Sequence, residues 1–70
     1  MDLEKKLELI KDVLDVESLA PEDNLSDIEE WDSLSALSIV IMVKDEFNRV
    51  LTGDEVRNFK TIQDILDVMS

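Results

Sequence analysis

The first apolar pattern in the chain has the spacing of a helix. Apolar side chains recur at intervals of three or four positions: Leu3, Leu7, Ile10 and Leu14. Residues at this spacing share one face of an α-helix, and Val13 widens that face. Asp2 stands just before the stripe and is a residue type that caps helix N-termini. The pattern therefore predicts an amphipathic helix over residues 3–15.

The helical period stops over residues 16–32. This stretch contains Pro21 and Asn24 and most of the small polar residues, which is typical of a loop. A loop of this length is unusual in a compact domain, and such loops are mostly functional or disordered. Scattered apolar residues are expected to attach it to the core: Val16, Leu19, Leu25, Ile28 and Trp31.

A third segment, beginning at Ser33, is apolar almost all the way round. Its apolar residues are Leu34, Ala36, Leu37, Ile39, Val40, Ile41, Met42, Val43 and Phe47. The length of the segment favours a helix over a strand. A helix of this kind is either fully buried or presents an apolar strip to a partner. Full burial is hard to arrange in a 70-residue domain, so we expect an exposed strip.

Helical spacing divides this segment into two ridges. Ser33, Leu37 and Ile41 are four apart and form one ridge, which we assign to the exposed strip. The other ridge is assigned to the core together with Ala36 and Ile39, and its members are Val40, Val43 and Phe47.

Two capping patterns predict the last helices. Thr52-x-x-Glu55 is a capping box that opens a short helix ending near Asn58. Thr61-x-x-Asp64 is a weaker version that opens the final helix. The predicted fold is therefore all-α: a four-helix bundle with a short third helix and a long loop between helices one and two. We expect one domain over residues 1–70.

Composition narrows the function. Eighteen acidic and seven basic residues give a net charge of -11, a field that repels nucleic acid and anionic membranes. The chain has neither a signal-peptide pattern nor an apolar run that could span a bilayer. We therefore expect a cytoplasmic monomer without stable membrane insertion. Histidine and cysteine are both missing, which removes the usual general base and the commonest zinc ligands. An enzyme with catalytic residues of its own is not predicted.

Acidic residues in the long loop raise the question of a calcium site. Asp23, Asn24 and Asp27 cluster there. Their spacing does not match the EF-hand pattern, and the glycine of that pattern is absent. A dedicated metal site is not predicted.

Ser33 is the one candidate for modification. The first turn of a helix has unpaired backbone N–H groups and a partial positive charge, which hold a phosphate attached there. Asp32 places a carboxylate beside the hydroxyl, where it can share a Mg²⁺ with an incoming phosphate donor. No base stands nearby in the sequence, so a second protein would have to perform the chemistry. The competing interpretation is that Ser33 only caps the helix.

The order of these features resembles the acyl carrier proteins and their peptidyl relatives over essentially the whole chain. The landmarks are the first helix, the loop segment PEDNL, Asp32-Ser33-Leu34, a helix ending in Asp45-Glu46-Phe47, the short third helix and the Thr-Ile-Gln-Asp start of the fourth.

The resemblance implies a mechanism. A phosphopantetheinyl transferase would move 4′-phosphopantetheine from coenzyme A onto Ser33. The thiol of this cofactor would carry an acyl group as a thioester to acyl-loading, modifying and acyl-transfer enzymes. The implied partner-binding residues are Asp32, Leu34, Leu37, Ile41, Asp45 and Glu46. The implied cargo cavity is lined by Val40, Val43, Val56 and Phe59.

Departures from the family pattern indicate a specialised standalone carrier. Ser35, Ser38 and Lys44 stand where members serving fatty-acid synthesis usually have acids. Trp31 stands where small or apolar residues are more common. We infer a dedicated fatty-acid, polyketide or other pathway whose enzymes present a less basic, more apolar docking face. Because Phe59 is large, we also expect long saturated chains to be poorly sheltered.

Two alternatives stay open at this point. The first is a peptidyl or amino-acyl carrier, which would use the same serine. The second is a cofactor-free helical interaction module, in which Ser33 is only a cap and Leu37 and Ile41 form the interface.

Overall fold

The computed structural model describes residues 2–70 and confirms the predicted all-α, four-helix fold. Its elements are α1 (Leu3–Leu14), the 3₁₀ turn η1 (Leu25–Asp27), α2 (Ser33–Phe47), α3 (Gly53–Arg57) and α4 (Ile62–Val68). Within the described residues no strand forms. Helix α1 ends one residue earlier than predicted, because Asp15 takes a left-handed conformation with φ of 57°.

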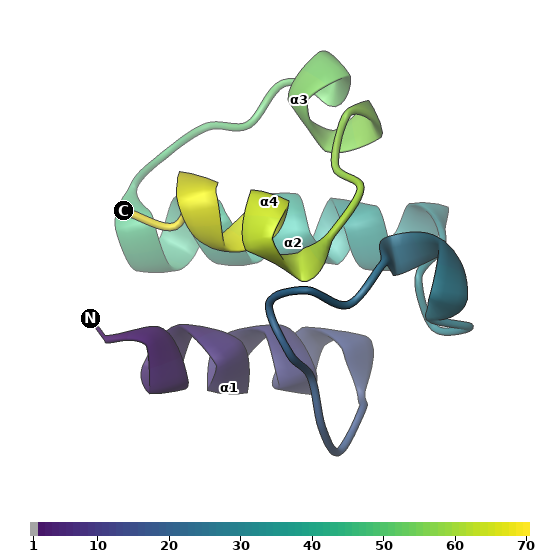
Figure 1. Cartoon of the computed structure of the whole chain (residues 1–70). Coiled ribbons are helices and arrows are strands. Elements are labelled where there is room, and N and C mark those ends of the chain that lie inside the picture. The colour runs from purple at the N-terminus through teal and green to yellow at the C-terminus, as the bar shows by residue number, and fades with distance from the viewer. Residues whose placement is uncertain (1) are drawn as a thin grey trace.

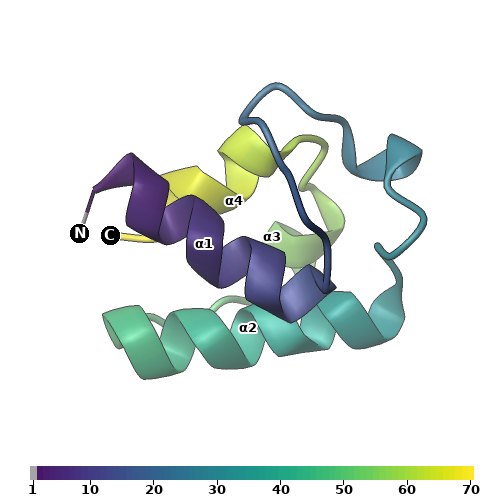
Figure 2. The ribbon, with the colours of Figure 1, turned by 90° about the horizontal axis from the view of Figure 1, so that it is seen from below.

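The helices pack so that the start of α2 lies at one end of the molecule. In Figure 1, α2 runs antiparallel to α1, and α4 runs in the same direction as α2. Helix α1 contacts both. Figure 2, seen from below, shows the start of α1 and the end of α4 near each other, at the opposite end from the start of α2. The long loop and the short helix α3 both contribute residues to the surface beside the N-terminal end of α2.

The core draws on three of the four helices and on the connections between them. Its buried hydrophobic residues are Ile10, Leu14, Leu25, Ile39, Met42, Val43, Leu51, Ile62, Ile65, Leu66 and Met69. Val40 and Phe47 are partly buried and pack against this cluster. Leu37 and Ile41, by contrast, are 56% and 54% exposed. The predicted division of α2 into a core face and an exposed strip is thus confirmed.

The long loop is tied to the connection between α3 and α4. The Leu25 N–H donates to the Lys60 carbonyl at 2.9 Å. In the other direction, the Ile62 N–H donates to the Asp23 carbonyl at 3.0 Å. Apolar side chains of the loop also pack on the core, as predicted: Val16, Leu19, Leu25, Ile28 and Trp31. These ties fix the loop in space, so that the residues leading into α2 are held in place.

Side-chain caps begin the helices at the predicted places. The Asp2 carboxylate accepts from the Lys5 N–H at 2.9 Å. Thr52 and Glu55 form both bonds of a capping box, each at 3.2 Å. At α4, the Asp64 carboxylate accepts from the N–H groups of Lys60 and Thr61. The capping predictions for α1, α3 and α4 are therefore confirmed.

Candidate functional site

Ser33 is the first residue of α2 and is not its cap. The N-cap is Asp32, whose Oδ1 accepts from the Ser35 N–H at 2.8 Å. The interpretation of Ser33 as a capping residue is therefore wrong. The reason is that aspartate caps as well as serine and stands one position earlier, within reach of the third N–H of the helix. The Ser33 side chain is exposed, and its hydroxyl is not needed to hold the helix end.

The charge of Asp32 is favoured by its place at the helix end. The N–H of Ser35 lowers the pKa of the Asp32 carboxyl most, and the Leu34 N–H lowers it further. Hydrogen bonds to the charged form stabilise that form. Asp32 therefore presents a carboxylate next to the Ser33 hydroxyl throughout the neutral pH range.

Ser35 holds the residues that lead into the site. Its hydroxyl donates to the carbonyl oxygen of Glu30, which belongs to the preceding loop. The N–H of Trp31 donates to the Ile28 carbonyl at 3.1 Å. These two hydrogen bonds hold the backbone on each side of Trp31, whose side chain is half-buried. The sequence marked Ser35 only as the place of a missing acid, whereas its hydroxyl has a positioning role.

A cavity of about 300 Å³ begins at Ser33. Its walls come from the loop, the first turn of α2 and helix α3 with the residues after it: Trp31, Asp32, Ser33, Ala36, Val56, Arg57 and Phe59. Of the four residues predicted for a cargo cavity, Val56 and Phe59 are in this wall and Val40 and Val43 are not. Val43 is fully buried in the core, and Val40 is partly buried against it.

The sequence did not place Trp31 or Arg57 in this wall. Trp31 carried one usable signal, since the single tryptophan of the chain stands directly before the Asp-Ser-Leu motif. Arg57 carried none, because an arginine in the last turn of a short helix is also expected simply to complement the helix dipole.

An apolar surface runs along α2 away from Ser33. Leu34 is 72% exposed, and Leu37 and Ile41 continue the same surface. Further along the helix, Asp45 and Glu46 are also exposed. The exposed apolar residues of α2 therefore lie between the Asp32 carboxylate at its start and the acidic residues near its end.

Low pH should weaken the helix cap that Asp32 forms, and comparison with an Asp32→Asn variant should isolate this effect. The folded-state pKa of Asp32 lies below the ordinary value of 3.8, so its charge contributes stability above that pH. This contribution is lost as the pH falls through the lowered pKa. Asp32→Asn keeps a capping side chain but does not titrate. We expect the wild type to be the more stable protein at pH 6, and the difference to close below pH 3.8. Urea unfolding at several pH values measures it, and a gap that is constant with pH would contradict this assignment.

Comparison with known proteins adds an independent observation. The family model described as "Phosphopantetheine attachment site" matches residues 7–69. The acyl carrier protein of Myxococcus xanthus is 37% identical over 54 residues, covering 77% of this chain and 68% of the relative. That of Micrococcus luteus is 37% identical over 54 residues, covering 77% and 67%. That of Thermosynechococcus vestitus is 30% identical over 70 residues, covering 97% and 86%. No solved structure gives a significant match.

Proposed function

The chain belongs to the acyl carrier protein family, whose cofactor is a covalent 4′-phosphopantetheine, and we propose that Ser33 is the residue that holds this cofactor. The observation that supports this most directly is that the cap of α2 and the candidate attachment residue are two different residues. Asp32 caps the helix, which leaves the exposed Ser33 hydroxyl available for modification.

The residues around Ser33 fit a phosphate-linked arm. The start of a 15-residue helix supplies backbone N–H groups and a partial positive charge to a phosphate on its first residue. The cavity that begins at Ser33 offers the apolar walls of Ala36, Val56 and Phe59 to the rest of the arm. When bound, the arm supplies the thiol that carries an acyl group as a thioester.

Attachment requires a second protein. In the proposed reaction, the Ser33 Oγ forms a bond to the phosphorus of the pantetheine phosphate of coenzyme A. The bond from that phosphorus to the adenosine bisphosphate leaving group breaks, and the serine proton passes to a base. No histidine or cysteine is present in the chain to serve as that base. We therefore propose that a phosphopantetheinyl transferase supplies it, and that this chain acts as a carrier without catalytic residues of its own.

Intact-mass measurement tests the attachment. The protein is incubated with coenzyme A and a broad-specificity phosphopantetheinyl transferase. We expect a mass gain equal to one phosphopantetheine per chain, which fragmentation then assigns to Ser33. A protein that gains no mass would contradict the proposal and favour a cofactor-free interaction module.

The surface of α2 supports a dedicated pathway over the general fatty-acid one. The residues proposed to meet partner enzymes are Asp32, Leu34, Leu37, Ile41, Asp45 and Glu46. Between the exposed Asp32 at the start of α2 and Asp45 and Glu46 near its end, the exposed large side chains of this surface are apolar. Enzymes that recognise acidic carriers through basic patches lose most of those contacts here.

A transmembrane helix long and apolar enough to cross a bilayer is not found in residues 2–70. The cytoplasmic location and monomeric state stay predictions.

Exchange between pathways tests the docking surface. We expect the loaded protein to be a poorer substrate than a housekeeping acyl carrier for housekeeping fatty-acid enzymes, by about tenfold or more in kcat/KM, which corresponds to about 1.4 kcal/mol. Both carriers are compared at the same ionic strength, because charge contacts weaken with salt. Equal efficiency with the two carriers would rule out the dedicated pathway.

A further inference from the structure

Ser35 makes two hydrogen bonds, one to each neighbour of Trp31. Its N–H donates to the Asp32 carboxylate at 2.8 Å, and its hydroxyl donates to the Glu30 carbonyl at 2.5 Å. Asp32 is the cap of α2, whereas Glu30 lies two residues earlier, in the loop. One residue of the helix therefore holds both ends of the short segment that leads into Ser33.

The third residue of the helix makes a different kind of bond in α3 and in α4. Glu55 of α3 and Asp64 of α4 are acids, and each accepts from the N–H of its own cap. An ionised carboxylate has no proton to donate, so an acid in this position could not bond to a carbonyl oxygen. A serine hydroxyl can, because it donates as well as accepts. Ser35 thus joins α2 to the loop before it by a bond that an acid could not make.

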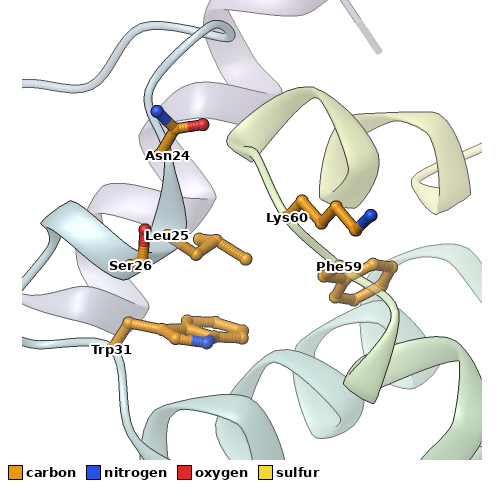
Figure 3. A pocket seen from close by; sticks show the side chains of 6 residues that line it. All are labelled: Asn24, Leu25, Ser26, Trp31, Phe59 and Lys60. Atoms are coloured by element: carbon orange, nitrogen blue, oxygen red, sulfur yellow. The ribbon is translucent and has the colours of Figure 1, made fainter.

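Side-chain packing alone does not fix Trp31. Its ring packs against the core but is only half-buried. The ring also lines a cavity of about 550 Å³, with Phe59 and Lys60 on the opposite side (Figure 3). Because open space lies beside the ring, the position of this segment depends on its hydrogen bonds. The Ser35 hydroxyl provides one of them and the Ile28 carbonyl another.

We propose that Ser35 is a positioning residue for the loading of Ser33. Its hydroxyl bond to Glu30 sets the segment from Glu30 to Asp32 in the orientation that a phosphopantetheinyl transferase binds. This inference rests on Ser33 as the attachment residue. A segment that is already held in place does not have to be ordered when the transferase binds, and ordering costs affinity. Loss of the bond should therefore weaken binding of the carrier and leave the chemical step unchanged.

Steady-state loading separates binding from chemistry. The protein is combined with coenzyme A and a broad-specificity phosphopantetheinyl transferase, and the rate of mass gain is measured at several carrier concentrations. For Ser35→Ala we expect the KM for the carrier to rise about fivefold, the size of effect that one lost hydrogen bond produces, while kcat stays unchanged. Ser35→Thr keeps the hydroxyl and should restore most of the wild-type KM.

Ser38→Ala is the matched control. The Ser38 hydroxyl also donates to a backbone carbonyl, that of Leu34 within the same helix, at 3.0 Å. Both serines are half-buried, and the same atom is removed from each. Because Ser38→Ala leaves the bond to the loop intact, it should keep the KM of the wild type.

Amide hydrogen exchange tests the positioning without any loading. The Trp31 N–H is bonded to the Ile28 carbonyl, inside the segment that Ser35 holds. We expect this N–H to exchange about fivefold faster in Ser35→Ala than in the wild type or in Ser38→Ala. The amide of Val43, in the buried part of α2, is the internal control and should exchange at similar rates in all three proteins.

The outcomes distinguish this proposal from the attachment itself. An unchanged KM for Ser35→Ala, or an equal rise in Ser38→Ala, overturns the positioning role and leaves Ser33 as the attachment residue. A Ser35→Thr protein as impaired as Ser35→Ala also overturns it, because the hydroxyl would then not be the group that acts. Failure of the wild type to gain mass overturns the attachment proposal and this one with it.

Discussion

The Ser33→Ala variant should gain no mass with coenzyme A and a phosphopantetheinyl transferase, whereas the wild type gains one arm. The loss is expected to be complete, because the substitution removes the oxygen that forms the bond to phosphorus. The fold should be unaffected. Ser33 is exposed, the cap is provided by Asp32, and alanine is a strong helix former. Far-UV circular dichroism of the variant should match that of the wild type.

Other serines of the same region are matched controls. The Ser38 hydroxyl lies one turn further along α2 and donates to the Leu34 carbonyl at 3.0 Å. Ser26 lies in the 3₁₀ turn η1 and is exposed. Ser38→Ala and Ser26→Ala should both load like the wild type. A Ser33→Ala protein that still gains the arm would show that another hydroxyl is the acceptor, and the fragment masses would identify it.

The faces of α2 could be predicted because burial follows the helical period. Ile39 and Val43 are four apart and both are fully buried. Leu37 and Ile41 are also four apart, and both are more than half exposed. Hydrophobicity alone did not separate these pairs. One pair must stay exposed because a domain of this size cannot bury every side of one helix.

The cap could not be assigned from sequence in the same way. Asp32 and Ser33 are neighbours, and both residue types cap helices well. The choice depends on which side chain reaches the Ser35 N–H, and this depends on the extended backbone at Asp32, with φ of -147°. That conformation follows from the path of the loop, which Ser35 and the core contacts of Trp31 restrain.

No local sequence pattern predicts that Trp31 and Phe59 meet in the wall of the cavity at Ser33. Trp31 and Phe59 are far apart in the chain, on a loop and on the connection after α3. Both line this cavity because the Leu25 N–H donates to the Lys60 carbonyl, which holds the two irregular segments together. Side-chain periodicity carries information about helices and strands, but such a backbone pairing leaves no periodic signal.

Replacing Ile62 with alanine should cause the largest loss of stability. Ile62 is 0% exposed at the start of α4, within the same cluster as Ile39 and Val43. Removing a buried isoleucine side chain costs about 2–5 kcal/mol, since the lost transfer free energy adds to that of the cavity left behind. A domain of this size is stable by only about 3–5 kcal/mol. Much of the variant should therefore be unfolded at 25 °C without denaturant.

Ile41→Ala is the same substitution on an exposed face and is the control for Ile62→Ala. Because Ile41 is 54% exposed, its free energy of unfolding should change by about 0.5 kcal/mol or less. Urea unfolding followed by Trp31 emission measures both variants. The Ile62 N–H also binds the Asp23 carbonyl, so partial loosening of α4 would release the loop and alter Trp31 emission before global unfolding. A loss for Ile62→Ala no greater than that for Ile41→Ala would contradict the place of Ile62 in the core.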